Sequence, residues 1–592
     1  MPHTHELVEA LRRWMRRHHM QAFIFPSTDP HCGEYTPDHW QTRAWISGFG
    51  GSAGTAVVTM DEAALWTDSR YWLAAADVLR DGPFQLMRDG HPDTPSITDW
   101  LIGLLPPHAT VGLDAWVNTL ADIQRYTDIF RAHDLELCTD YDPAERLWQD
   151  RPTLPLHPVE LQPEAFTGRT TTQKIALIRQ QARLRSDEAL LVSQLDDIAW
   201  TLNLRGTDVH RTPVFVSYLL ILGEPLDGDT EAILYIDRRK LTPHVREYLR
   251  EQGIEVRRYN HLELDDRWTV RYDPAHTNTG IYDRCFRSAE IQNPIPALKA
   301  VKTTQEIEGY RDAMLQEGIA MVRLMRWLVP AVEADGVTEI GVDEQLTRLR
   351  SEAPLFRDLS FDTIAGYGAH GAIVHYEATP QTDIPLEPRG FLLLDSGGQY
   401  QNGTTALTRT IPLGPLTEAE RRDYTLVLKG HLRLSMARFP EGTSGTQLDV
   451  LARYAMWQDG KNYGHGTGHG IGSYLNCHEG PHQFRMNYMP APLRAHMTVT
   501  VEPGIYIAGS HGCRTENTML IVPDGDNEFG HWLRLEPLTL CPIPTSPIVM
   551  DLMTPDEVAY LNAYHQRVRT TLLPHLNDPA DRDWLLRATE AI

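Results

Sequence analysis

The sequence predicts a mixed α/β protein built from three successive domains, and two observations support this prediction. Short β-rich runs such as 22-AFIFP-26 and 214-VFVSYLLIL-222 alternate with helical stretches, the pattern of α/β domains. Two proline-bearing stretches, 151–166 and 293–304, interrupt that pattern. Prolines at this density block helices and inner strands. We therefore expect linkers there, and domains over residues 1–160, 161–300 and 301–592.

Composition narrows the class of protein. A chain of 592 residues is too long for one core. Its 79 acidic and 55 basic residues give a net charge of −24, which argues against nucleic acid or an anionic membrane as a partner. No apolar run resembles a signal peptide or approaches the roughly 18 residues of a membrane helix. Six cysteines without a C-x-x-C pair favour free thiols in the cytoplasm.

The first two domains resemble each other weakly. Each places a tryptophan, Trp45 or Trp200, in an apolar stretch that is followed by glycine. Each then has a strand-like run that ends in Asp-x-Arg, at Asp68 and Asp237. This similarity indicates a duplication.

The third domain is predicted to open with a long helix. Thr303 and Glu306 form a capping-box signature. Apolar residues then recur at helical steps, and the methionines among them are expected to fill the core. These residues are Ile307, Tyr310, Met314, Met321, Met325 and Leu328. Strands and glycine loops are expected to dominate after this helix.

Carboxylates and histidines cluster in the last third of the chain. The apolar run 391–394 predicts a buried strand that ends in Asp395, although one such aspartate also suits a turn before two glycines. Met497 to Val501 alternates like a half-buried strand and leads to Glu502. Glu516 precedes another predicted strand, and Arg514 is expected on the same strand face. An Arg–Glu ion pair is the alternative.

Three histidines stand in a glycine-rich segment: His465, His469 and His478. Glycines let a substrate or a metal approach the backbone closely, so these histidines favour function over structure. Asp395, His469, Glu502 and Glu516 form a mixed nitrogen and oxygen set that suits Mn²⁺, Co²⁺ or Zn²⁺. Cys477 and Cys513 fit no zinc-site spacing.

These motifs resemble the aminopeptidase P (Xaa-Pro aminopeptidase) family in its long, three-domain cytosolic form. The likeness also covers 46-ISGFGGSAGTAVVT-59, 66-WTDSRYW-72, 197-DIAWTLNLRGTDV-209 and 371-GAIVHYEAT-379. It implies two creatinase-like α/β domains followed by a pita-bread metallopeptidase domain. It also implies removal of an N-terminal residue that precedes proline, two divalent ions with Mn²⁺ foremost, and a homodimer.

The resemblance also assigns roles to single residues. Asp395 matches a ligand of one metal, His469 and Glu502 match ligands of the other, and Glu516 matches a bridging ligand. The resemblance further implies catalytic or substrate-binding roles for His375, His465 and His478, and places Arg514 near the active site. Glu502 could also carry a proton.

One position departs from the family pattern. A second bridging aspartate would fall eleven residues after Asp395, where this chain has Ala406. We therefore expect one strong metal site at His469, Glu502 and Glu516, a weak one at Asp395, and impaired activity. Without its metal, Asp395 is expected to take up a proton, a water or a cation, because Glu516 lies near.

Three functions remain open: the metallopeptidase, a metal-independent creatinase-like hydrolase, and a non-catalytic pita-bread binding protein. The retained ligands favour the first. Ala406 has two possible origins, a single introduced change or a natural one. The intact residues around it favour the first origin.

Overall fold

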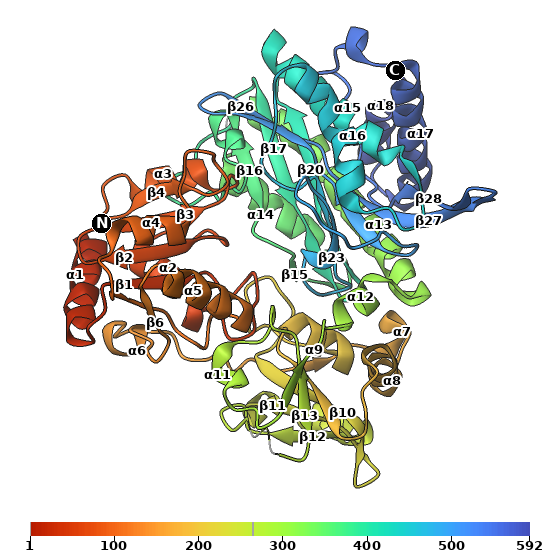
Figure 1. Cartoon of the computed structure of the whole chain (residues 1–592). Coiled ribbons are helices and arrows are strands. Elements are labelled where there is room, and N and C mark those ends of the chain that lie inside the picture. The colour runs from red at the N-terminus through yellow and green to blue at the C-terminus, as the bar shows by residue number, and fades with distance from the viewer. Residues whose placement is uncertain (1, 263, 265, 335) are drawn as a thin grey trace. The chain divides into compact units, whose positions relative to one another are not determined.

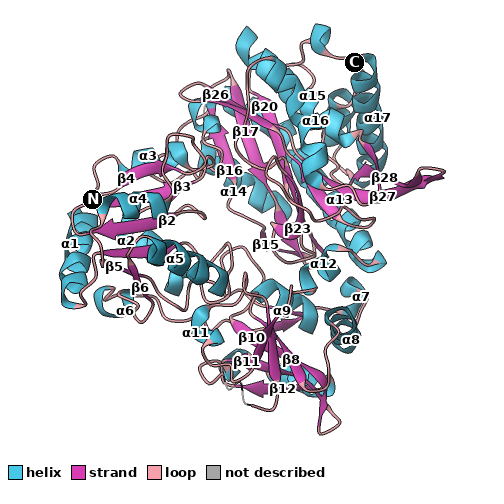
Figure 2. Cartoon of the chain, viewed as in Figure 1, coloured by secondary structure: helices cyan, strands magenta, loops and turns pink. Residues whose placement is uncertain are grey.

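The computed structural model describes residues 2–262, 264, 266–334 and 336–592 (Figures 1 and 2). The chain forms two compact units. Unit 1 contains Met1–Gln162 and Arg169–Ile295, and unit 2 contains Pro163–Gly168 and Pro296–Ile592. None of the helices in the described part of the chain combines the length and apolarity that a membrane crossing needs.

The first half of unit 1 is a six-stranded sheet with helices, in the strand order β4-β3-β2-β1-β5-β6. Strands β1, β2 and β3 pair antiparallel, and the outer pairs are parallel. The elements are α1 (Pro2–Arg17), β1 (Ala22–Pro26), α2 (Thr42–Ser47), β2 (Thr55–Thr59), β3 (Ala63–Thr67), α3 (Trp72–Leu79), β4 (Gln85–Arg88), α4 (Ile97–Leu104), β5 (Thr110–Gly112), α5 (Leu120–Ala132), β6 (Glu136–Cys138) and α6 (Ala144–Leu147).

The second half of unit 1 repeats this topology, in the order β12-β11-β10-β8-β13-β14. Each strand pair has the same sense as its counterpart in the first sheet. The elements are β7 (Glu160–Leu161), α8 (Thr171–Ala182), β8 (Glu188–Val192), α9 (Leu195–Leu202), β9 (Leu204–Arg205), β10 (Ser217–Leu226), β11 (Thr230–Ile236), α10 (Pro243–Glu251), β12 (Ile254–Arg257), β13 (Thr269–Tyr272), α11 (Thr279–Tyr282) and β14 (Ser288–Glu290).

The shared topology supports the predicted duplication. Trp45 and Trp200 lie in the matching helices α2 and α9. Asp68 and Asp237 follow the matching strands β3 and β11, and each carboxylate accepts hydrogen bonds from the arginine two residues later.

The prediction that the proline stretches block helices is wrong. The second stretch contains α12 (Ile295–Ala300), and the first contains β7 and part of α7 (Glu164–Thr167). Pro163 and Pro296 lie at the starts of these helices, where a missing N–H has no helical partner to lose. The three-domain boundaries themselves remain a prediction.

In unit 2 the predicted long helix is present as α13 (Thr304–Glu333), which follows α12. Its Thr303–Glu306 capping box is formed, and Met314, Met321 and Met325 are buried in the core as predicted. The expectation that strands and loops dominate afterwards is incomplete, because five further helices follow in the described residues. These are α14 (Glu339–Arg350), α15 (Glu418–Ser435), α16 (Gly445–Gln458), α17 (Pro555–Leu572) and α18 (Pro579–Ala588).

Asp395 lies in the sheet β16-β17-β20, and Glu502 and Glu516 directly flank strands β24 and β27 of the sheet β21-β28-β27-β24. His469 and Arg514 lie in the two-stranded sheets β22-β23 and β25-β26. A bridge between Thr408 and Glu516 joins β20 to the start of β27. The strands are β15 (Phe356–Leu359), β16 (Ile364–Tyr367), β17 (Phe391–Ser396), β18 (Gly398–Tyr400), β19 (Gly403–Thr404), β20 (Leu407–Pro412), β21 (Arg438–Pro440), β22 (Gly468–Gly470), β23 (Glu479–Phe484), β24 (Thr498–Val501), β25 (Gly504–Ile507), β26 (His511–Arg514), β27 (Asn517–Asn527) and β28 (Gly530–Pro537).

Candidate metal centre

Asp395 lies near the end of β17, a strand that is buried along its whole length as predicted. It pairs with Thr408 of β20. Its Oδ2 accepts hydrogen bonds from Arg514, at 2.6 Å from Nη2 and 3.0 Å from Nε. Its Oδ1 is buried and has no hydrogen-bond partner among the described residues. One oxygen of Asp395 is thus held by an arginine, and the other is available to a ligand.

His469 and Glu502 are brought together by the approach of β22 to β24. A Cβ at Gly468 would lie 1.8 Å from the carbonyl oxygen of Thr500, so only glycine allows this approach. Thr500 accepts a hydrogen bond from the His469 N–H at 3.0 Å and donates one to Glu502 Oε1 at 3.1 Å. The prediction of a half-buried strand is wrong here, because every residue of β24 is buried.

Glu516 lies between β26 and β27, so it does not share a strand with Arg514, contrary to the prediction. The alternative Arg–Glu ion pair is replaced by the pair between Arg514 and Asp395. The Glu516 N–H donates to the carbonyl of Thr408, and Thr408 Oγ1 donates to Glu516 Oε2 at 2.8 Å. The buried Arg409 donates to the carbonyls of both Thr408 and Glu516. Glu516 is therefore fixed by its backbone and by its side chain.

His469, Glu502 and Glu516 each place a ligand atom within 4.8 Å of the others. His469 Nδ1 lies 2.8 Å from the carbonyl of Gly470, so Nδ1 carries the proton. Nε2 then presents a lone pair 3.4 Å from Glu502 Oε1. A histidine that is oriented through its other nitrogen, beside two carboxylates, fits a divalent cation. Asp395 does not belong to this close group.

The electrostatics of the site also favour a cation. Burial, with the charge of Asp395 added, raises the pKa of Glu502 to about 7. Burial and the charges of Asp395 and Glu502 raise the pKa of Glu516 well above its usual value. Burial alone would lower the pKa of Arg514, but Tyr506 and the nearby carboxylates raise it, so Arg514 stays charged. The single positive charge of Arg514 does not balance the negative charges of three ionised carboxylates, Asp395, Glu502 and Glu516.

A directed set of hydrogen bonds connects Arg514 to His465. Arg514 Nη1 donates to the Tyr506 hydroxyl at 2.7 Å. His465 Nδ1 lies 2.7 Å from the carbonyl of Gly466 and must donate to it, so Nε2 accepts from the Tyr506 hydroxyl at 2.8 Å. Tyr506 was not predicted from the sequence, because His465 lies 41 residues away and only the fold brings the two together.

The other predicted histidines stand in two different settings. The His478 and His469 rings lie 4.3 Å apart between centroids, so His478 is beside the close group. His375 is held through its neighbours, because the Val374 carbonyl accepts from Arg514 and the Tyr376 hydroxyl donates to the buried Glu339.

Ala406 directly precedes β20 and lies two residues before Thr408, the partner of Asp395. Ala406 is 2% exposed and packs in an apolar cluster with Tyr310, Met314 and other side chains. A carboxylate at this position would be buried among them and would need a cation to remain charged.

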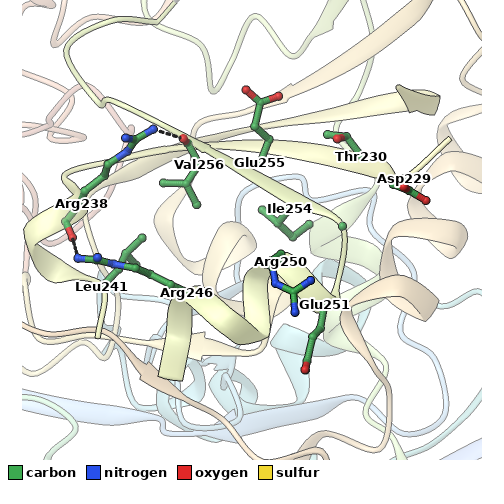
Figure 3. A pocket seen from close by; sticks show the side chains of 11 residues that line it. Asp229, Thr230, Arg238, Leu241, Arg246, Arg250, Glu251, Ile254, Glu255 and Val256 are labelled. Carbon is green, nitrogen blue, oxygen red and sulfur yellow. Dashed lines mark hydrogen bonds between the residues drawn. The ribbon is translucent and has the colours of Figure 1, made fainter. Parts of the chain in front are cut away.

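A separate pocket in unit 1 contains none of the predicted site residues (Figure 3). Arg238 donates to the carbonyl of Val256, and Arg246 donates to the carbonyl of Arg238. The pocket is lined by three arginines and three acidic residues, so its charge favours neither an anion nor a cation. The charged lining residues are Arg238, Arg246, Arg250, Asp229, Glu251 and Glu255.

Comparisons with known families cover nearly the whole chain. Residues 308–523 match the Metallopeptidase family M24, and residues 531–592 match the C-terminal region of peptidase M24. Residues 8–142 and 150–306 match Creatinase/Prolidase N-terminal domains. The predicted fold, two creatinase-like domains followed by a pita-bread metallopeptidase domain, is thereby confirmed.

Individual proteins are similar over the same length. Aminopeptidase P1 of Lotus japonicus is 35% identical over 99% of both chains. The probable Xaa-Pro aminopeptidase P of Laccaria bicolor is 37% identical over 99% of this chain and 93% of its own. The X-prolyl aminopeptidase of Caenorhabditis elegans, described as a cytosolic enzyme with a di-nuclear active site, superposes with a TM-score of 0.91. It is 32% identical over 97% of this chain and 95% of its own. This chain therefore belongs to the aminopeptidase P (Xaa-Pro aminopeptidase) family of M24 metallopeptidases.

Proposed function

We propose that this chain removes the N-terminal residue from peptides with proline at the second position, and that Ala406 impairs this activity. The observation that carries the proposal is the convergence of His469, Glu502 and Glu516 within 4.8 Å. These residues would hold one divalent ion, with Mn²⁺ the first expectation and Zn²⁺ or Co²⁺ the alternatives. When bound, the ion supplies Lewis-acid polarisation and lowers the pKa of water.

The protein's own groups would perform the proton transfers. Glu502 would act as a general base that takes a proton from water and delivers it to the proline nitrogen. His478 and His375 would donate hydrogen bonds to the oxyanion of the tetrahedral intermediate. Arg514 and Tyr506 would hold His465 and Asp395 in place around the substrate.

Ala406 would weaken a second ion at Asp395. That position retains only Asp395 and a share of Glu516, whereas divalent ions at catalytic sites usually have three protein ligands. Arg514 already occupies one oxygen of Asp395. We therefore propose one strongly bound ion in this chain and two after Ala406→Asp.

The same proposal includes the oligomeric state, the location and the partners of the protein. We expect a homodimer in the cytoplasm that acts on peptides with an N-terminal Xaa-Pro, with neither nucleic acid nor a membrane as partner. The net charge of −24 supports the last two points.

Peptide hydrolysis with and without a chelator separates the proposal from its alternatives. The Ala406→Asp protein loaded with Mn²⁺ should cleave an Xaa-Pro tripeptide but not its Xaa-Ala counterpart, and a strong chelator should abolish cleavage. Activity that survives chelation would favour the metal-independent hydrolase. Binding of the Xaa-Pro tripeptide without cleavage would favour the non-catalytic protein.

A further inference from the structure

A buried ion pair lies behind the strand that carries Asp395. Glu317 of α13 and Arg350, the last residue of α14, have side chains that are 1% and 0% exposed. Arg350 Nη2 lies 2.7 Å from Glu317 Oε1, and Nε lies 3.1 Å from both carboxylate oxygens. We call this the rear ion pair.

The rear ion pair contacts both ends of the segment between β17 and β20. Arg350 Nη1 lies 2.6 Å from Ser396 Oγ, and Ser396 directly follows Asp395. Thr405 Oγ1 donates to Glu317 Oε2 at 2.9 Å, and Thr405 directly precedes Ala406.

The contact of Arg350 with Ser396 lies on the face of β17 opposite the Asp395 side chain. Ser396 pairs with Leu407, and Asp395 pairs with Thr408. Side chains alternate along a strand, so Ser396 and Asp395 point to opposite faces of β17, while Thr405 and Ala406 lie just before β20. The rear ion pair therefore holds the direct chain neighbours of Asp395 and of position 406, the two positions of the second metal site.

The segment has little freedom to adopt another shape. A Cβ at Gly397 would lie 1.9 Å from the Thr405 carbonyl oxygen, and one at Gly309 of α13 would lie 2.0 Å from that of Asn402. Thr405 Oγ1 also accepts from the Gly398 N–H at 2.8 Å. The segment is packed against itself and against α13.

Stability alone does not account for a buried ion pair. Both charges lose their hydration, and apolar residues of similar volume often stabilise a protein as well or better. The forked guanidinium instead fixes the direction of each hydrogen bond. The pair is suited to set the geometry of the residues that it contacts.

We propose that Glu317 and Arg350 are positioning residues for the second metal site, and that they keep Asp395 and position 406 at ligand spacing even though position 406 is alanine. The inference rests on the proposed function, because it concerns the same ions. The inference predicts that an aspartate introduced at position 406 binds the second ion without a change in the backbone. It also predicts that the affinity for this ion depends on Ser396 and Thr405.

The test compares Ala406→Asp alone with Ala406→Asp combined with Thr405→Val or Ser396→Ala. These two changes remove a contact with the rear ion pair without leaving a charge buried alone. Full-length, chelator-treated proteins are titrated with MnCl₂ by calorimetry. Ala406→Asp should add a second ion, and each added change should weaken it by about 10- to 100-fold, the usual effect of altering outer-shell partners. The affinity of the first ion should stay unchanged.

A control separates positioning from general destabilisation. Lys429 and Glu557 form another largely buried ion pair, with exposures of 10% and 1%, which has no contact with the segment in the described structure. Lys429→Met should lower the thermal midpoint but leave the second ion bound as in Ala406→Asp. If Ala406→Asp binds the second ion with the same affinity when Thr405→Val or Ser396→Ala is added, the inference is overturned and the proposed function is not affected. Failure of Ala406→Asp itself to bind a second ion would overturn the proposed function and the inference with it.

Discussion

At the scale of single residues, the ion pair between Arg514 and Asp395 is the feature that could not be predicted from the sequence. Arg514 pairs with Asp395 Oδ2, and the expectation that Asp395 takes up a proton, a water or a buffer cation stays a prediction for its Oδ1. Within the centre, burial and neighbouring carboxylates raise the pKa values of Glu502 and Glu516. The charge that needs a metal therefore lies on the His469 side of the centre.

This distribution predicts the order in which ions bind. In crystals soaked in Mn²⁺, the anomalous density beside His469 should be stronger than that beside Asp395, because three ligands converge there. Arg514→Met should raise the density beside Asp395 by releasing its Oδ2. Stronger density beside Asp395 in the unchanged chain would contradict the ranking.

His565 gives a pH dependence outside the metal centre. Burial lowers its pKa from 6.5 to about 4, and its Nε2 accepts from the Ile543 N–H, which requires the neutral ring. The unfolded chain therefore binds the proton more readily, so stability is full above pH 6.5 and falls as the pH drops toward 4.

The effect of His565 should reach about 2 kcal/mol between pH 6.5 and about pH 5. Urea unfolding of the protein and of His565→Gln at both pH values measures it, and the variant should lose that part of the pH dependence. His133→Gln, at an exposed position, is the control and should keep it. An unchanged dependence in His565→Gln would show that other groups cause it.

At the scale of elements, the close approach of β22 and β24 builds the metal centre. Gly468→Ala should separate these strands, because its Cβ would meet the Thr500 carbonyl oxygen at 1.8 Å. We expect a loss of stability of about 1–3 kcal/mol and a weaker first ion. Calorimetric Mn²⁺ titration and thermal unfolding would measure both.

Gly466→Ala is the matched control, because its Cβ would come no closer than 3.4 Å to a neighbour. It should bind Mn²⁺ like the unchanged chain. Normal Mn²⁺ affinity in Gly468→Ala would mean that the spacing of the strands does not set the site.

The elements that the sequence predicted well are those with local signals. The capping box of α13 and the apolar run of β17 are such signals, and both elements form as expected. The contacts of Arg514 with Asp395, of Tyr506 with His465 and of Glu317 with Thr405 could not be predicted. Their partners lie 119, 41 and 88 residues apart in sequence, and only the tertiary fold brings them together. The helix α12 was missed because proline is tolerated in a first turn.

At the scale of the whole molecule, an apolar stripe on α16 bears on the proposed homodimer. Val450, Tyr454 and Trp457 recur at helical steps and are 41%, 51% and 40% exposed. Exposed stripes of this kind mark interaction surfaces. Because we propose a homodimer, we expect a second copy of the chain to cover this stripe.

We expect Tyr454→Glu to shift the protein from dimer to monomer in sedimentation velocity, because it places charge within the stripe. Phe529→Glu changes a side chain that is 78% exposed on the β27–β28 turn and should leave the dimer intact. A Tyr454→Glu protein that remains dimeric would place the interface elsewhere.

The central claim is that position 406 decides how many ions the centre holds and how fast it works. The most direct measurement is metal content and Xaa-Pro tripeptide cleavage, side by side, for this chain and for Ala406→Asp, each dialysed against Mn²⁺. We predict one tightly bound ion and slow or absent cleavage for this chain, and two ions with cleavage faster by at least about 100-fold, or about 2.7 kcal/mol of barrier, for Ala406→Asp. Equal metal content and equal rates in the two proteins would contradict the claim.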